Sequence, residues 1–321
     1  MSDFNPGPGM SVLLVTYNHK SYIARALESL FNQDYPGSIE LVIADDASTD
    51  GTMDVIRAYE GRDTRFVFKY LSNVTNLGIT KNYQRGFGAC SGPYVAVLEG
   101  DDYWVSPKKL SRQVRFLDEH WECDLCSVNY FVFYEESATF VERTTIGSGH
   151  RLLTARDLIA DNLVGNFSTC MYRKSALECL PTELFEVRSY DWIVNICVAR
   201  ASMIGFIEEP MSVYRIHSSG AWSNYKQVEK LQLQLSLIPT YNRLTDQRFD
   251  TEFSRLEHDL RKLIILARGE RMAAGGGRLA MLSLSRVRDF MPPILTTIIR
   301  ALLPPVMTRL LLRIARRGQR L

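Results

Sequence analysis

The sequence lacks any run of the ~18 uncharged apolar residues that a membrane-spanning helix needs. The nearest approach, Phe290 to Ile299, contains two prolines and ends at Arg300. Cysteine is scarce, with six irregularly spaced residues among 321, which excludes a disulfide-built scaffold. The first ten residues also lack the charged-then-apolar order of an export signal. We therefore expect a protein of the reducing cytoplasm.

Glycine is absent from the first loop, where several nucleotide-binding folds require it. The run Ser11 to Thr16 predicts a buried strand, and the loop that follows begins Tyr17-Asn18-His19. A dinucleotide-binding oxidoreductase would need a glycine-rich turn there. An ATP- or GTP-hydrolysing enzyme would need a Gly-Lys-Ser/Thr phosphate loop, which the sequence does not contain. Both enzyme classes are disfavoured.

Charge of one sign is hardly in excess, since 38 basic residues face 36 acidic ones, so no nucleic-acid partner is expected. The charge is unevenly distributed, however. From Arg271 onward there are ten arginines and one acid, a local +9 that leaves the preceding residues at −7. Leu310, Arg313, Ile314 and Arg317 have the spacing of an amphipathic helix. We expect this tail to bind an anionic membrane surface, which would place the protein at the inner face of the cell membrane. Packing on its own body or on a partner stays open.

Strands and helices alternate along the first hundred residues. Predicted strands cover residues 11–16, 39–44, 66–70 and 94–98, and helices are predicted from Ser21 to Phe31, over 52–59 and from about 79 to 88. This alternation predicts an α/β fold with a mainly parallel sheet flanked by helices. A further helix should begin with Ser106 as N-cap and Pro107 in its first turn.

The second half of the chain has less regular signals. Strands are expected over 125–133, 168–172 and 205–207, and helices after Thr154, over 191–200 and along 226–271. Gly275 to Gly277 would form a hinge. We predict two domains, a catalytic body at 1–222 and a helical extension with a basic tail at 223–321.

Adjacent carboxylates follow two of the predicted strands. In parallel sheets, ligands bind outside the carboxyl ends of the strands, and both Asp101-Asp102 and Asp45-Asp46 lie there. A divalent cation would offset the repulsion within Asp101-Asp102 and would bring a substrate diphosphate with it. One carboxylate of Asp45-Asp46 could accept a hydrogen bond from a base ring N–H. Ordinary polar turns or helix caps are the alternative at both places.

Four segments occur in a specific order and spacing: SVLLVTYNHKSYIARALESLFNQ, ELVIADDASTDGT, NLGITKN and VLEGDDYW. Over roughly residues 10 to 104 they resemble the N-terminal half of family 2 glycosyltransferases, which have the GT-A fold. The resemblance continues, less specifically, through Asp191-Trp192 and Tyr214-Arg215-Ile216-His217.

The resemblance implies a site for a nucleotide-diphosphate sugar, with UDP as the expected nucleotide. The residues implied to surround it are Thr16, Tyr17 and Asn18 along the pocket, Asp45 or Asp46 at the base, and Asn76, Gly78, Lys81 and Asn82 beside the ribose and diphosphate. Asp101-Asp102 takes the place of the family's D-x-D-like motif, with Asp102 as the expected ligand of Mn²⁺ or Mg²⁺.

Three later residues complete the implied site. Asp191 begins a predicted helix and matches the family's catalytic acid position, so it is expected to take the proton of the acceptor hydroxyl; a role as helix N-cap is the alternative. His217 resembles a histidine that joins the metal or diphosphate in some relatives. Arg215 could pair with phosphate.

The implied activity is inverting transfer of a sugar to a glycan or lipid-linked acceptor, in the setting of bacterial surface polysaccharide assembly. A metal-dependent nucleotidyltransferase would use similar carboxylates. A non-catalytic scaffold that binds sugar nucleotides is the other alternative.

Overall fold

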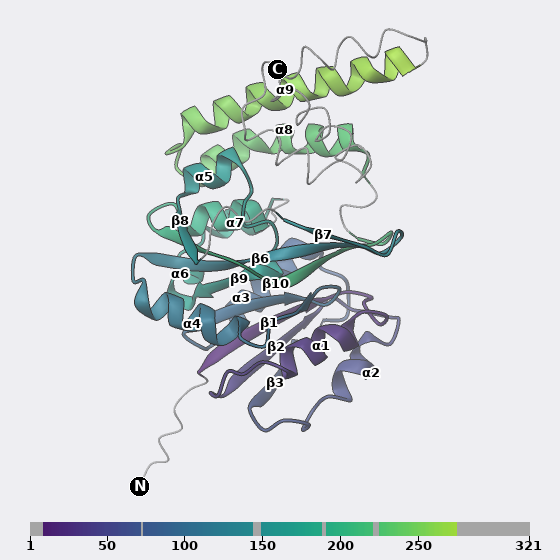
Figure 1. Ribbon diagram of the computed structural model, residues 1–321, viewed down its shortest axis with the longest axis vertical. Helices are drawn as coiled ribbons and strands as arrows, with labels where there is room; N and C mark the ends of the chain where they lie inside the picture. The colour runs from purple at the N-terminus through teal and green to yellow at the C-terminus, as the bar shows by residue number, and fades with distance from the viewer. Residues whose placement is uncertain (1–8, 72, 144–148, 188–190, 221–224, 275–321) are drawn as a thin grey trace, which may run out of the picture. The chain divides into compact units, whose positions relative to one another are not determined.

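The computed structural model describes residues 9–71, 73–143, 149–187, 191–220 and 225–274, with the backbone alone at 269–274 (Figure 1). Its internal contacts divide the chain into two units. The first runs to residue 223, except that residues 159–163 group with the second, which continues from residue 224. The prediction of two domains split after residue 222 stays a prediction, and Gly275 to Gly277 and the basic tail lie outside the described residues.

The first half of the first unit forms the parallel part of the sheet. Its strands are β1 (Met10–Thr16), β2 (Ile39–Asp45), β3 (Phe66–Tyr70) and β4 (Tyr94–Glu99), ordered β3-β2-β1-β4. The helices between them are α1 (Ile23–Phe31), α2 (Thr52–Arg57) and α3 (Ile79–Ala89). Every element predicted here from hydrophobic periodicity is present, because each apolar run shows the period of the strand or helix that it forms. The α/β prediction is confirmed, and the strand ends that carry the acids lie at one edge of the sheet.

The second half of the unit extends the same sheet with mixed pairing. Beyond β4 come β9 (Cys170–Arg173), β6 (Cys123–Tyr134), β10 (Met203–Ile216) and β5 (Tyr103–Trp104), with β7 (Thr139–Glu142) on β6 and β8 (His150–Leu153) on β10. Strand β9 runs antiparallel to both β4 and β6, whereas β6 and β10 are parallel to each other. The remaining elements of this unit are helix α4 (Lys109–Glu119), α5 (Ala155–Ala160, of which the last two residues group with the second unit), η1 (Phe167–Thr169), α6 (Lys174–Glu178), η2 (Thr182–Phe185) and α7 (Asp191–Val198).

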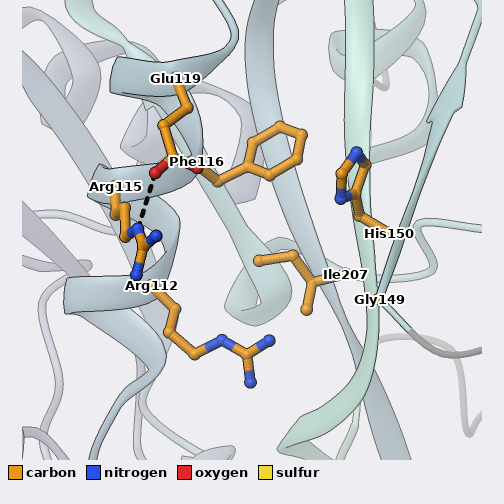
Figure 2. A pocket seen from close by; sticks show the side chains of 7 residues that line it. All are labelled: Arg112, Arg115, Phe116, Glu119, Gly149, His150 and Ile207. Carbon is orange, nitrogen blue, oxygen red and sulfur yellow. Dashed lines mark hydrogen bonds and ion pairs between the residues drawn. The ribbon is translucent and has the colours of Figure 1, made fainter.

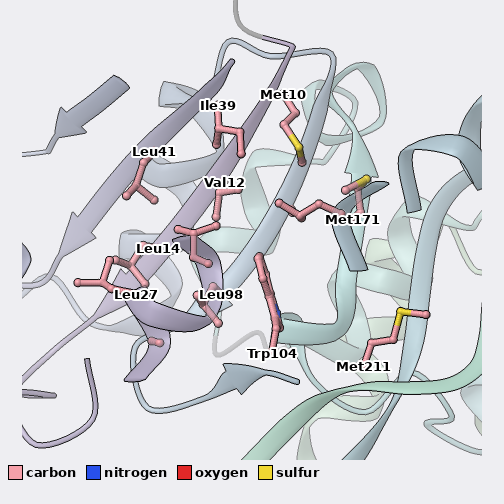
Figure 3. Close-up of a cluster of buried hydrophobic side chains, with 14 of the residues drawn as sticks. Met10, Val12, Leu14, Leu27, Ile39, Leu41, Leu98, Trp104, Met171 and Met211 are labelled. Carbon is pink, nitrogen blue, oxygen red and sulfur yellow. The ribbon is translucent and has the colours of Figure 1, made fainter. Parts of the chain in front are cut away.

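The core of this unit forms between the sheet and its helices. Met10, Val12 and Leu14 alternate along β1, and none of the three is exposed (Figure 3). They share one hydrophobic cluster with Leu27 of α1 and Ile39 of β2 (Figure 3). Fully burying one such aliphatic side chain stabilises the fold by about 1.5–3 kcal/mol. This packing holds β1, β2 and β4 rigidly, so the loops after them have a fixed base.

Helix α4 begins at Lys109, two residues later than predicted. Ser106 and Pro107 belong instead to the turn after β5, in which Lys109 N–H donates to the Ser106 carbonyl at 3.4 Å. The helix start is set by Gln33, whose Oε1 accepts from Leu110 N–H at 3.1 Å and whose Nε2 donates to Ser106 O at 2.9 Å. A side chain more than seventy positions away thus satisfies a first-turn N–H, and no local sequence signal could reveal it.

Strand β10 is much longer than the predicted 205–207. The polar Glu208-Glu209 and Pro210 interrupt its apolar pattern, and the register shifts between Ile207 and Ser212. A β-bulge accommodates both the proline and the break, so the strand continues to Ile216. The longer strand brings Arg215 beside the acids that follow β4.

The second unit contains two long helices, α8 (Gln227–Leu244) and α9 (Asp250–Ala274), which contact each other. Asn242 Nδ2 donates to Asp250 Oδ1 at 2.7 Å between them. Within the described residues, no helix combines the length and apolar character needed to cross a membrane.

Candidate functional site

The loop after β1 is fastened to the loop after β2. Asn18, at φ 54°, donates its backbone N–H to Ser48 Oγ at 2.8 Å, and its side-chain oxygen accepts from Thr49 N–H at 2.9 Å. Thr16 is almost fully buried, whereas Tyr17 is 46% exposed. The loop that carries these three residues is therefore held in place, and Tyr17 and Asn18 are the two of them that are exposed to a ligand.

Asp45 and Asp46 end up in different surroundings. Asp45 caps its own turn. Its Oδ2 accepts from the backbone N–H of Ser48, and its Oδ1 accepts from the hydroxyl of the same residue. Asp46 reaches the loop before α3, where its carboxylate accepts from Leu77 N–H at 2.8 Å, Gly78 N–H at 2.9 Å and Asn73 Nδ2 at 3.1 Å. Asp46 thus has extensive structural bonding, and contact of either carboxylate with a nucleotide base stays a prediction.

We expect Asp46→Ala to lower the free energy of unfolding by about 1–3 kcal/mol, because three donors of the β3–α3 loop lose their acceptor. Asp46→Asn should lose less, since it keeps one acceptor oxygen. Urea denaturation of both variants would measure the difference. Equal stability of wild type and Asp46→Ala would show that the carboxylate does not organise this loop.

The residues implied to lie beside the ribose and diphosphate surround the start of α3. Asn76 Nδ2 donates to the Asp46 carbonyl at 3.1 Å, and Gly78 adopts a φ of 83° just before the helix. Asn82 is 1% exposed and donates to the Ala44 carbonyl at 2.7 Å, so it ties α3 to β2. Lys81 forms an ion pair with Glu186. Asn82 is therefore built into the scaffold, while the other three lie nearer the surface.

Asp101 lies between two histidines. Its Oδ2 is 3.1 Å from His217 Nε2 and 3.6 Å from His19 Nε2. The other ring nitrogen of His217 lies 2.8 Å from Ser219 Oγ, which fixes the ring. Burial alone would raise the pKa of Asp101, yet the His217 hydrogen bond and the charges of both histidines hold that pKa below its usual value. Burial also lowers the pKa of His19. Asp101 thus differs from its neighbour Asp102 in that its pKa is lowered rather than raised.

Asp102 points elsewhere, although it is the next residue. It is 1% exposed, and its Oδ1 accepts from the backbone N–H of Arg215 at 2.9 Å. Arg215 in turn donates its Nε to the Asp101 carbonyl at 2.9 Å. Burial and the neighbouring Asp101 charge raise the pKa of Asp102 well above its usual value. Two hydrogen bonds from Arg215 thus connect strand β10 to the Asp101-Asp102 turn.

Glu99, the last residue of β4, belongs to the same acidic group but was not predicted from the sequence. It accepts from Tyr83 Oη at 2.8 Å. Its backbone N–H donates to Ser168 Oγ at 3.0 Å. Burial, and then the charges of Asp102, Asp101 and Asp191, raise the pKa of Glu99 well above its usual value. The sequence signal was the Glu-Gly-Asp-Asp run itself, in which a third acid stands two positions before Asp101.

Asp191 is the first residue of α7 and belongs electrostatically to this group. Its charge is among the causes that raise the pKa of Glu99 and of Tyr214, after burial and the charges of Asp102 and Asp101. The structure therefore gathers acids from the end of β4 and the start of α7, separated by about ninety positions in the chain. Its assignment as catalytic base stays a prediction.

A surface pocket lies at another place in the same unit. Figure 2 shows Phe116 of α4, His150 of β8 and Ile207 of β10 lining it, together with Arg112 and Arg115. Arg112 pairs with Glu209 and Arg115 with Glu119, so both cations are already neutralised. None of the site residues predicted from the sequence lines this pocket.

A family model described as Glycosyl transferase family 2 matches residues 11–181, more than half of the chain and the segment that carries the parallel strands and the acidic turn. The chain belongs to glycosyltransferase family 2. The predicted resemblance is thereby confirmed.

Two relatives are similar to this chain over different lengths. An uncharacterised protein of Mycobacterium tuberculosis is 35% identical over 213 residues, which is 66% of this chain and 60% of the relative. The putative teichuronic acid biosynthesis glycosyltransferase TuaG of Bacillus subtilis is 36% identical over 112 residues, 35% of this chain and 43% of the relative. The match thus spans three fifths of the mycobacterial protein's length.

The fold is shared with solved family structures. The mannosyltransferase PcManGT from Pyrobaculum calidifontis, solved in complex with GDP-Man and Mn²⁺, superimposes with a TM-score of 0.61. The comparison covers 92% of this chain and 84% of that chain at 19% sequence identity. The GT-A fold is therefore shown for this chain as well.

Proposed function

We propose that this family member is an enzyme that transfers a sugar from a nucleoside-diphosphate donor to an acceptor hydroxyl. The observation that carries the proposal is the meeting of Asp101 and His217 at the end of β4, 3.1 Å apart, in the crevice where ligands of such sheets bind. Asp101 and His217 are 116 positions apart in the chain, so the fold itself brings this carboxylate and this imidazole together at the carboxyl end of the sheet.

The residues at this point fit a divalent cation. A carboxylate oxygen and an imidazole nitrogen are both suitable ligands for Mn²⁺, and Ser219 holds the ring so that Nε2 faces Asp101. In the described part of the chain, no cluster of three or more acidic, histidine or cysteine side chains is arranged to hold a metal. The remaining ligands would be diphosphate and water oxygens, as is usual for Mg²⁺. Bound there, the cation would neutralise the negative charge of the departing diphosphate.

We propose Asp101 and His217, rather than Asp102, as the protein ligands. Asp102 keeps Arg215 and β10 in register, since it binds the Arg215 backbone N–H. Arg215 supports the turn through its bond to the Asp101 carbonyl, and its side chain is only 8% exposed. Contact of Arg215 with a phosphate remains a prediction from the resemblance.

Asp191 is our candidate for the catalytic base. A carboxylate near the other acids, but on a separate element, can face the acceptor side of the donor and take the hydroxyl proton as the new bond forms. A single displacement of this kind inverts the anomeric centre. The acceptor we propose is a glycan or lipid-linked sugar of a cell-surface polysaccharide at the inner face of the membrane. The polysaccharide part of this proposal is supported by the relative TuaG, which is named as a putative teichuronic acid biosynthesis glycosyltransferase.

Donor binding tests the proposal directly. Candidate UDP- and GDP-sugars should raise the melting temperature of the full chain, and Mn²⁺ should enlarge the shift for the correct donor, because binding to the native state alone stabilises it. The same mixture should slowly release free sugar. A protein that is stabilised by no nucleoside diphosphate, with or without Mn²⁺, would not have this function.

A further inference from the structure

The hairpin of β6 and β7 exposes an aromatic surface beside the candidate site. Phe140 on β7 is 53% exposed, and its ring packs on that of Phe133 on β6, with centroids 4.6 Å apart. Figure 1 shows β7 running along β6 in the first unit.

This ring pair continues a row that starts at the acidic turn. Arg215 is the register partner of Phe133 in the parallel β10–β6 pair, and Phe133 is the partner of Phe140 in the antiparallel β6–β7 pair. Partners in register share a face of the sheet, so the three side chains lie in one line. The Arg215 guanidinium carbon is 5.4 Å from the Phe133 ring centroid, and its Nε binds the Asp101 carbonyl. The row therefore leads from the proposed cation site to the surface at Phe140.

Carboxylates surround the exposed end of the row. Glu135 accepts from Tyr22 Oη at 2.9 Å and lies 3.6 Å from Arg215 Nη1. Glu136, in the turn between β6 and β7, and Glu142, the last residue of β7, are both exposed. Because Glu135 is paired with Arg215, the exposed negative charge here comes from Glu136 and Glu142, and it disfavours an anionic lipid surface or a nucleic acid. Carboxylates accept hydrogen bonds from hydroxyl groups, and an aromatic face packs well against the C–H face of a sugar ring. The rim and the ring together fit a neutral polyol.

We propose that Phe140 is the stacking platform for a pyranose ring of the acceptor, held beside the donor site by the Phe133–Arg215 row. This inference rests on the proposed function, because it supplies the place of the acceptor in that reaction. It assigns to the hairpin a sugar-binding role that is separate from donor and cation binding.

Binding of simple pyranosides tests the platform without knowledge of the true acceptor. Saturation-transfer NMR of the full chain with methyl β-D-glucopyranoside, methyl β-D-galactopyranoside and methyl α-D-mannopyranoside should show contact with at least one of them. Phe140→Ala should weaken that contact roughly three- to tenfold, the size expected for losing one stacked ring. Phe140→Trp should retain it, because the indole offers a larger flat face.

A matched control comes from the same unit. Trp121, 86% exposed just after α4, is an aromatic residue outside the row, and Trp121→Ala should leave pyranoside contact unchanged. UDP or GDP binding with Mn²⁺ should be the same in Phe140→Ala as in wild type. If that donor binding is absent from every variant, the proposed function fails while pyranoside contact still reports on the platform.

Three results would overturn the platform. The first is no pyranoside contact in wild type, and the second is equal contact in wild type and Phe140→Ala. The third is loss of binding to phosphatidylglycerol vesicles in Phe140→Ala with unchanged pyranoside contact, which would make the aromatic surface a lipid contact. Because Phe140 is half exposed, its alanine variant should fold, and an unchanged melting temperature would verify this.

Discussion

The Asp191→Asn variant is expected to lose sugar transfer by a factor of about 10²–10⁴ while it binds donor as wild type does. The amide cannot take a proton from the acceptor hydroxyl, yet it has nearly the same shape and can still occupy the first turn of α7. Transfer would be followed with the donor found by thermal stabilisation, and donor affinity by calorimetry on the same protein. The expected split is a large fall in kcat with donor binding preserved.

Asp54→Asn is the matched control, since Asp54 is also an acid in the first turn of a helix but is exposed on α2. A helix-terminal charge alone is worth about 0.3–1 kcal/mol. If both variants show the same small loss of stability and normal turnover, Asp191 is only a helix-terminal residue.

Asp101→Asn should lose most of the Mn²⁺-dependent part of nucleoside-diphosphate binding, roughly tenfold or more, because the amide removes the ionised oxygen that faces His217. Calorimetry would measure the affinity for UDP and GDP with and without Mn²⁺, and the ratio of the two affinities, the Mn²⁺ ratio, is the quantity compared between variants. His217→Ala should show a similar loss in the same measurement, since it removes the partner nitrogen.

Asp102→Asn separates the two neighbouring carboxylates. Its side-chain oxygen can still accept from Arg215 N–H, so the turn and β10 should remain in register. The Mn²⁺ ratio should then stay near that of wild type. If Mn²⁺ no longer strengthens nucleoside-diphosphate binding in Asp102→Asn, but still strengthens it normally in Asp101→Asn, the assignment is reversed and Asp102 is the ligand.

Local sequence was most informative where the hydrophobic periodicity is regular. The strands from Met10 to Glu99 and the helices between them lie close to their predicted positions, since each apolar run shows the period of the element that it forms. It was least informative where a distant residue decides the outcome. Gln33 sets the start of α4. The bulge at Pro210 interrupts the apolar pattern of β10, so the half of the strand after it was not predicted.

Family membership and the position of the acids at the ends of parallel strands were determined by the sequence alone, because ordered motifs and hydrophobic periodicity are properties of the chain. Which acid faces which partner was decided only by tertiary structure. Asp101 and Asp102 are adjacent, but one faces His217 and the other the Arg215 backbone, both on or just after a strand more than a hundred positions away. Side-chain direction at a turn depends on what packs against it, and that partner becomes known only when the sheet is complete.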